Sequence, residues 1–201
     1  MTAATSKQWL LAVDPSIRST GVALFRSGDL ISADVIKASD AKASTADIGM
    51  RTLRMAQEVV AWVVGCDAAP GTLVGEYPQI YTTDKSKGDP NDLLALAGVL
   101  GAVSGLLSMG LAQRDETLSV LSYTPAEWSG QLPKCTKKSG ILTSPRAERI
   151  LSRLSVDERA ILQAAGLFKK VSHDAVDAVG IGLHSLGRFA RRRVYGRGGD
   201  E

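Results

Sequence analysis

The order of the apolar segments constrains this chain most, because three strand-like segments come before the first helical one. Residues 9–14 form a short apolar run that ends in an acid, and two further runs at 20–25 and 30–36 follow after turn residues. Short apolar runs separated by turns predict adjacent antiparallel strands. We therefore predict that a sheet begins with a meander of three strands.

Helices and strands alternate after the meander. Apolar residues at helical spacing cover 43–64, and the run at 72–76 is a fourth strand. The other predicted elements are a small-residue helix that opens at 89–91 and includes 93–111, a strand at 117–123, a short helix around Trp128, a loop at 129–144, helices at 145–154 and 156–165, and a helix from Ser172 to about Arg192. Strands joined by helices after a meander indicate a mixed α/β fold. The sequence contains neither G-x-G-x-x-G nor a Walker A loop.

Length and composition indicate one globular domain. The 201 residues suffice for a single core, and we predict one domain over 1–195 with a disordered tail at 196–201. With 44% hydrophobic and 22% charged residues, global disorder and fibrous classes are excluded. The net charge of +3 is too small to indicate a nucleic-acid partner by itself, so the distribution of the basic residues has to decide.

Three features indicate a cytoplasmic protein. The two cysteines, Cys66 and Cys135, lack metal-ligand spacing and fit free thiols in a reducing compartment. The first residues lead into a strand without a charged and then apolar leader. The apolar run at 93–111 contains four glycines and falls just short of the about 20 apolar residues that a membrane span needs. We expect no membrane contact; the small residues suit close packing, either between subunits or within the chain.

Four acids stand where a site can form. Asp14 and Glu76 each end a predicted buried strand, and the carboxyl ends of strands are where open α/β sheets build their sites. Asp174 and Asp177 are three residues apart and share one helix face. Taken singly, each acid is also explained as a residue leaving the core or as a helix cap. Together, converging carboxylates suit hard divalent cations such as Mg²⁺, and paired ions assist phosphoryl transfer. The set indicates metal-assisted phosphodiester cleavage.

A family resemblance rests on these acids and their neighbours. The pattern Asp14-Pro-Ser-x-x-x-Thr20-Gly21, then the strand-ending Glu76, then Asp174-Ala-Val-Asp177-Ala178, resembles the RuvC type of Holliday-junction resolvase in the ribonuclease H-like superfamily. The order and rough spacing hold from Leu10 to about Leu186. The resemblance implies an α/β, ribonuclease H-like fold in which helices flank a five-stranded mixed sheet, antiparallel at first and parallel afterwards.

The same resemblance implies an activity. Members of the family are homodimers that cut four-way DNA junctions by hydrolysis and leave 5′-phosphate and 3′-hydroxyl ends. By this likeness the catalytic metal ligands are Asp14, Glu76, Asp174 and Asp177, which hold two Mg²⁺ ions, with Mn²⁺ as a substitute. The expected partners are branched DNA and a second copy of the chain, and the expected location is the cytoplasm of a bacterium or of a phage's bacterial host.

The chain also departs from the family pattern. Ser16 stands where the family has Gly, and Gln79 stands where it has a stacking aromatic. Tyr77 and Tyr81 flank that place and are candidates for base stacking. The loop at 128–144 and the arginine-rich tail resemble phage-borne relatives more than the cellular bacterial enzyme.

Further candidates come from the neighbours of the acids and from the basic clusters. His173 precedes Asp174, where some relatives have a His, and is a candidate catalytic helper. Lysines in a comparable region of the family contact phosphates, so Lys134 and Lys138 are candidate helpers as well. The candidate DNA-binding residues are Lys134, Lys137, Lys138, Tyr77, Tyr81, Arg188, Arg191, Arg192 and Arg193. For the arginines, sequence-independent phosphate contacts and a solubilising charge are the two readings.

Two other classes of function compete with a nuclease. An actin- or hexokinase-like ATPase or kinase also opens with an acid, a turn and Thr-Gly. It would need a second glycine-rich phosphate loop and an adenosine pocket, and neither is visible, so we expect no nucleotide cofactor. A non-catalytic nucleic-acid-binding protein on the same fold is the third class, and the complete set of acids argues against it.

Overall fold

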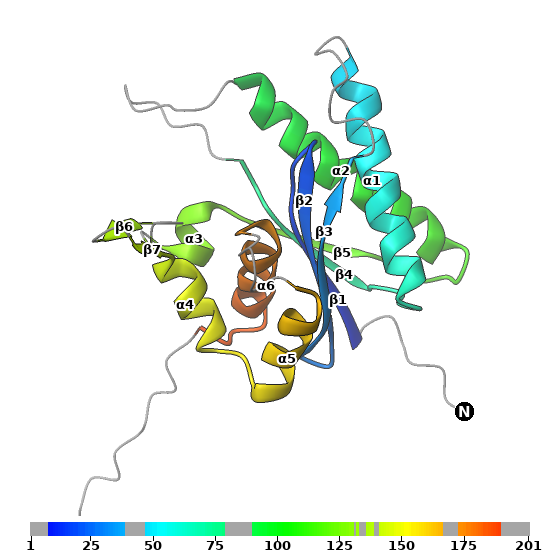
Figure 1. The fold of residues 1–201 in the computed structure, drawn as a ribbon. Coiled ribbons are helices and arrows are strands. Elements are labelled where there is room, and N and C mark those ends of the chain that lie inside the picture. Colours follow the sequence, from blue (N-terminus) through cyan, green and yellow to red (C-terminus); the bar gives the residue numbers. More distant parts are fainter. Residues whose placement is uncertain are drawn as a thin grey trace, which may run out of the picture.

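The computed structural model describes residues 8–38, 47–78, 90–130, 132, 136–138, 141–166 and 173–189. At its centre is a five-stranded sheet with the strand order β3-β2-β1-β4-β5 (Figure 1). Its strands are β1 (Trp9–Asp14), β2 (Ser19–Arg26), β3 (Asp29–Lys37), β4 (Thr72–Glu76) and β5 (Ser119–Tyr123). The first three pair antiparallel, whereas β4 pairs parallel with β1 and β5 pairs parallel with β4. The predicted mixed sheet is confirmed.

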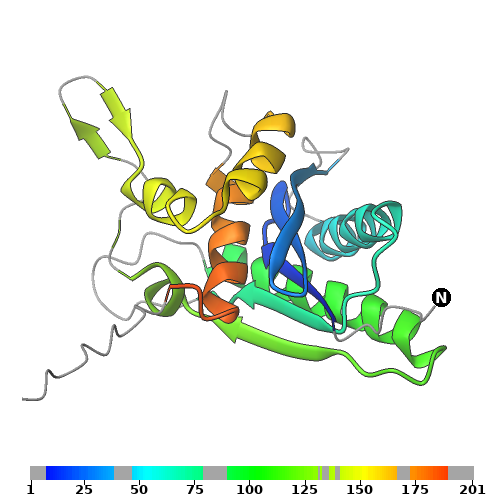
Figure 2. The same ribbon diagram turned by 90° about the horizontal axis from the view of Figure 1, so that it is seen from below.

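Helices cover both faces of this sheet. α1 (Ile48–Gly65) and α2 (Pro90–Ala112) lie on one face, and α6 (His173–Ser185) lies on the other (Figure 1). Around α6 are the short helices α3 (Pro125–Ser129), α4 (Pro145–Leu151) and α5 (Val156–Ala164) (Figure 2). The layers therefore enclose two cores, one on each side of the sheet.

The alternation of side chains along β1 assigns its residues to the two cores. Leu11 and Val13 pack in the core with α1 and α2, whereas Leu10 and Ala12 pack in the core with α6. All four are buried, which explains why the strand reads as a continuous apolar run rather than as alternating polar and apolar residues. By the same period of two, Asp14 lies on the α6 side of the sheet.

The structure differs from two predicted elements, the loop before α4 and the C-terminal end of α6. Within the predicted loop at 129–144, β6 (Thr136–Lys138) and β7 (Ile141–Thr143) form an antiparallel pair. Its lysines and threonines lack the apolar alternation that marks a strand. The last helix ends at Ser185 rather than near Arg192 because Gly187 takes a positive φ of 69° and its N–H donates to the His184 carbonyl, a common helix stop.

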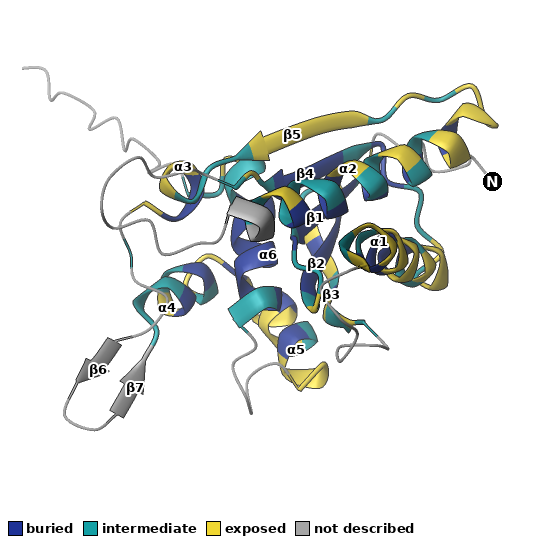
Figure 3. Cartoon of the chain, turned by 90° about the horizontal axis from the view of Figure 1, so that it is seen from above, coloured by how far each residue is buried: buried dark blue, intermediate teal, exposed yellow. Residues whose placement is uncertain are grey.

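The small-residue helix forms where it was predicted, as α2, but its apolar run reaches the length and hydropathy of a membrane span. Over Leu93–Ala112 the mean hydropathy is 2.0, so length and composition alone would permit a membrane span, and the expectation that this run falls short is wrong. Only 28% of this window is buried in the fold. Val99 and Val103 are fully buried against the sheet, while Leu94 and Met109 are exposed. Figure 3 shows the exposed side of α2 next to the exposed strand β5.

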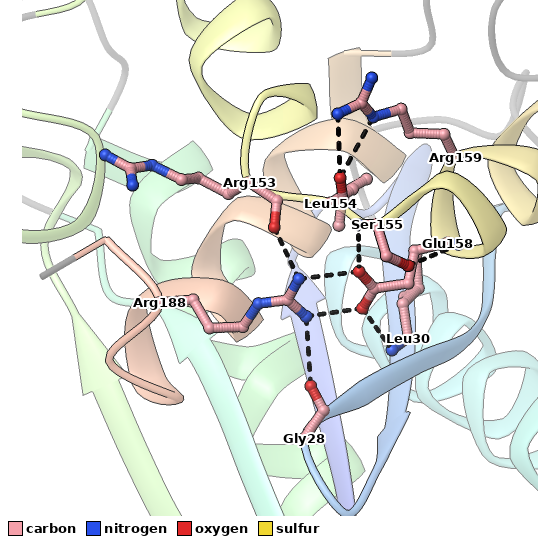
Figure 4. A network of polar contacts seen from close by, with 8 residues as sticks. All are labelled: Gly28, Leu30, Arg153, Leu154, Ser155, Glu158, Arg159 and Arg188. Carbon is pink, nitrogen blue, oxygen red and sulfur yellow. Dashed lines mark hydrogen bonds and ion pairs between the residues drawn. The ribbon is translucent and has the colours of Figure 1, made fainter. Parts of the chain in front are cut away.

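An ion pair between the buried Glu158 and the partly exposed Arg188 lies at the far end of the α6 layer. Both carboxylate oxygens of Glu158 accept hydrogen bonds from Arg188, at 2.6 and 2.7 Å, and also from the backbone N–H groups of Leu30 and Ser155 (Figure 4). Arg188 donates further to the carbonyls of Gly28 and Arg153. Burial raises the pKa of Glu158, but these hydrogen bonds outweigh it and lower the pKa to about 2. We call this pair the Glu158 clasp.

The clasp changes the role expected of one arginine. From the sequence we expected Arg188 to contact DNA phosphates. Its two terminal nitrogens instead bind Glu158 and two backbone carbonyls, so that the turn between β2 and β3, the start of α5 and the end of α6 are tied together. These contacts give Arg188 a structural role in this fold, and its contact with DNA phosphates stays a prediction.

Candidate active site

Two of the four predicted acids end neighbouring parallel strands. Val13 and Gly75 are partners in the pairing of β1 with β4, so Asp14 and Glu76, the next residues, lie at the same edge of the sheet. Val74 packs in the core with α6, so the alternation along β4 places Glu76 on the α6 side, like Asp14. Both are half-buried. The sheet therefore presents two carboxylates side by side toward α6.

A glycine brings the start of α6 against this edge. Gly21 is the β2 partner of Asp14, and a Cβ atom placed on it would lie 1.9 Å from the backbone carbonyl oxygen of Asp174. Only a residue without a side chain permits this approach. Ser19 strengthens the contact, because its hydroxyl donates a 2.6 Å hydrogen bond to the Asp174 carboxylate. Asp174 is thus next to the strand pair that carries Asp14.

The turn after Asp14 is held by a buried threonine. The Thr20 hydroxyl donates to the Ser16 carbonyl and accepts from the Ser16 N–H, at 2.5 and 3.0 Å. Thr20 is fully buried, so these bonds also satisfy its own polar group. The Thr20-Gly21 pair therefore shapes the backbone beneath the edge and admits α6.

The fourth acid is the most buried. Asp177 is 2% exposed and lies on the face of α6 that packs into the core. The Arg146 guanidinium, on α4, donates to it through Nη1 at 3.2 Å. A buried carboxylate requires such a partner, because an uncompensated charge in the interior is strongly unfavourable.

Arg146 and Trp128 together link two of the acids. The indole Nε1 of Trp128 donates a 2.7 Å hydrogen bond to Glu76, and the guanidinium carbon of Arg146 lies 5.1 Å from the centre of the Trp128 ring. Arg146 also donates to the carbonyl of Leu132, through Nε at 3.3 Å and Nη2 at 3.1 Å. One stacked pair of side chains therefore contacts Glu76 and Asp177.

Sequence reasoning did not identify Trp128 and Arg146 as site residues. One signal was available for Arg146, because it stands in the first turn of α4, directly after Pro145, where the helix dipole disfavours a positive charge. A cation in that position needs a specific anionic partner. Trp128 carries no comparable signal, since an indole in a short helix is typical of a core.

The other predicted site residues are placed only in part. His173 is the first residue of α6 and is half-buried, and Tyr77 follows Glu76 and is 53% exposed. Lys137 and Lys138 lie on β6, which extends away from the sheet (Figure 2). The remaining candidates, Lys134, Tyr81, Arg191, Arg192 and Arg193, lie outside the described residues.

The acids fit a divalent cation in kind but do not form a ready metal cluster. All four are carboxylates, the donors that Mg²⁺ prefers, and they come from β1, β4 and α6 at one edge. Within the described part of the chain, however, no three His, Cys, Asp or Glu side chains form a group that could hold a metal ion. Glu76 accepts a hydrogen bond from Trp128, Asp174 accepts one from Ser19, and Asp177 accepts one from Arg146. A cation would have to compete with these donors.

Comparison with known proteins gives matches to solved structures. No protein-family description matches its sequence, and no curated protein does. A Thermus thermophilus RuvC structure has a TM-score of 0.50 and 19% identity, and the match covers 89% of this chain and 93% of that one. T. thermophilus RuvC in complex with a Holliday junction substrate has a TM-score of 0.47 and 16% identity over the same shares. The human cytomegalovirus terminase nuclease domain has a TM-score of 0.43 and 12% identity, covering 90% and 86%.

The likeness to the RuvC structure with a TM-score of 0.50 bears on the fold alone. At such identities a shared architecture does not transfer an activity. The strand order β3-β2-β1-β4-β5, the helices on both faces and the likeness to the RuvC structure agree with one another. The chain has a ribonuclease H-like fold.

Proposed function

We propose that this protein is a metal-dependent endonuclease that cuts branched DNA, with the four-way junction as its substrate. One observation carries the proposal: Asp14 and Glu76 end neighbouring strands on the α6 side, and Asp174 is packed against the β2 partner of Asp14. The likeness of motifs to the RuvC type, together with the ribonuclease H-like fold, selects a nuclease among the chemistries open to carboxylates.

The chain's own residues would hold and orient the carboxylates. Asp14 and Glu76 come from the rigid sheet edge, and Asp174 and Asp177 come from the first turns of α6. Trp128 orients Glu76 and Ser19 orients Asp174 through the hydrogen bonds described above. Mg²⁺ bound by these four residues would activate a water molecule and stabilise the leaving oxygen. Hydrolysis would leave 5′-phosphate and 3′-hydroxyl ends.

A cleavage assay tests the proposal directly. The purified chain is incubated with four-way junctions, forks, flaps and linear duplexes, in Mg²⁺, in Mn²⁺ and in EDTA. We expect paired nicks in the junction with either metal and none in EDTA. Asp14→Asn should abolish cleavage, whereas Asp157→Asn, which changes an exposed acid on α5, should cleave like the wild type. Equal cutting of linear duplex would reduce the proposal to a general nuclease, and metal-independent cutting would refute it.

We also propose that the protein acts as a homodimer through the exposed side of α2. Gly98 packs within the chain, because a Cβ there would lie 3.1 Å from Thr52 on α1. At Gly101 and Gly105 a Cβ would meet nothing within 4 Å, so packing inside the chain does not explain these two glycines. Leu94 and Met109, 72% and 70% exposed, lie on the same helix. An apolar, small-residue surface of this kind suits a second copy of the chain.

Light scattering tests the dimer. Because the space at Gly101 is open, Gly101→Leu should leave the melting temperature of the monomer unchanged and weaken self-association. On a junction it should produce single nicks in place of paired ones. A wild-type protein that stays monomeric at high concentration and on the junction would contradict the dimer.

A further inference from the structure

Arg146 carries a charge that the proposed nuclease chemistry does not use. Its side chain is 11% exposed and that of Asp177 is 3% exposed, so the pair is almost out of water. Arg146 makes one contact with the carboxylate and two with the Leu132 carbonyl, and its guanidinium lies over Trp128. These contacts place a fixed positive charge beside the most buried acid of the site.

The burial of Asp177 creates an electrostatic problem when no metal is present. A carboxylate at this depth is strongly destabilising unless a positive charge compensates it. Arg146 supplies that charge in the structure described here. A divalent cation bound to Asp177 would supply the same compensation, and two cationic groups close to one carboxylate repel each other.

We propose that Arg146 is the internal counter-cation of the site: it balances Asp177 while no divalent cation is bound, and it competes with that cation for the carboxylate. The inference rests on the proposed function, because it assumes that Asp177 is a metal ligand. It makes Arg146 a positioning residue. Arg146 stabilises the metal-free fold and, at the same time, weakens metal binding.

The competition predicts an unusual result for Arg146→Gln. The metal-free variant should melt about 5–10 °C below the wild type, because the buried Asp177 carboxylate loses its ion pair with the Arg146 guanidinium. The variant should nevertheless bind Mg²⁺ and Mn²⁺ about tenfold more tightly, since the cation no longer displaces a charge-assisted hydrogen bond. Saturating Mg²⁺ should therefore raise its melting temperature more than that of the wild type.

The metal dissociation constant and the melting temperature are both measured without DNA cleavage. Isothermal titration calorimetry with Mg²⁺ alone and with Mn²⁺ alone measures the dissociation constants. Thermal melting in EDTA and in saturating Mg²⁺ measures how far each cation restores stability. Arg146→Lys, which keeps the charge but cannot reach both Asp177 and Leu132 with a planar fork, should show the same changes at a smaller size. This second variant keeps the test usable if Arg146→Gln does not fold.

Arg149 and Arg188 provide matched controls. Arg149 is on the same helix and donates to the Ser129 carbonyl, and it stacks on Phe189 at 4.7 Å, with no carboxylate involved. Arg188 pairs with Glu158 at the far end of the layer. Arg149→Gln and Arg188→Gln should lower the melting temperature equally in EDTA and in Mg²⁺, and should leave the metal dissociation constants unchanged.

The outcomes separate the two proposals. If the wild type neither binds Mg²⁺ nor cuts any DNA, the proposed function fails. If the wild type does both, but Arg146→Gln binds Mg²⁺ as weakly as the wild type or more weakly, only the counter-cation role is overturned. In the Asp177→Asn background, Arg146→Gln should no longer tighten metal binding, and a persisting effect would show that Arg146 acts through another group.

Discussion

Two arginine–carboxylate pairs adjoin α6, each with a buried carboxylate, and their geometries differ. In the Glu158 clasp the arginine engages both carboxylate oxygens, and two backbone N–H groups add to them. In the Asp177 pair Arg146 donates one hydrogen bond to the carboxylate, at 3.2 Å. Its other two nitrogens donate to the backbone carbonyl of Leu132. The first pair ties the β2–β3 turn to the start of α5 and the end of α6, whereas the second joins α4 to α6.

Under the proposed function, the comparison separates a structural ion pair from a functional one. A structural carboxylate is surrounded by donors from several elements, so that nothing remains for a ligand and the charge is neutralised within the chain. Under the proposed function, Asp177 would have to exchange its 3.2 Å bond from Arg146 for a bound cation. Burial does not separate the two, because Glu158 is 4% exposed and Asp177 is 2% exposed.

The largest expected difference between the two pairs is in the cleavage rate after each acid is neutralised in turn. Asp177→Asn should lower the rate of junction cleavage by about a thousandfold or more, because metal ligands act as a unit. Glu158→Gln should leave the rate per folded molecule unchanged. Cleavage under single-turnover conditions, corrected for the folded fraction by circular dichroism, measures both. Similar losses in the two variants would remove the functional distinction.

The next effect is on stability, where a change is expected for Glu158, the acid whose neutralisation should not alter the cleavage rate. Glu158→Gln should lower the melting temperature at pH 7 by about 5–10 °C, because Arg188 and two N–H groups lose a charged acceptor. The folded pKa of about 2 lies below the ordinary value of 4.5, so the clasp contributes stability above pH 4.5 and loses it as the pH falls toward 2. The gap between wild type and variant should therefore close in thermal melts between pH 5 and pH 2. A gap that is independent of pH would contradict the assignment.

The smallest effect concerns a hydroxyl that orients an acid. Ser19→Ala removes the 2.6 Å bond to Asp174 and should slow cleavage by about fivefold to tenfold without lowering the melting temperature by more than a few degrees. Ser152→Ala is the matched control, because its hydroxyl donates to a backbone carbonyl on an exposed surface of α4. If both variants cleave at the wild-type rate, Ser19 does not position Asp174.

The sequence predicts the parts of this site that follow from strand and helix periodicity. The sequence shows two apolar runs, which end in Asp14 and Glu76, and an acid pair three residues apart. Each can be recognised because it follows the local repeat of a strand or a helix. The partners of these acids are not visible, since Trp128 and Arg146 reach them from α3 and α4 through tertiary packing. For the same reason Arg188 reads as one of several tail arginines, although its helix stops at Ser185 and the chain folds back onto Glu158.

The contact between Gly21 and Asp174 also means that the candidate site forms late during synthesis of the chain. Ser19 and Asp174 are 155 positions apart, so the candidate site joins the beginning of the chain to its last helix. A ribosome-bound chain that has emerged only as far as α5 carries Asp14 and Glu76 but lacks the other two acids. Closing so large a loop is slow compared with forming the β1–β3 meander. The set of four candidate acids is therefore complete only when synthesis reaches α6, and unfinished chains lack two of them.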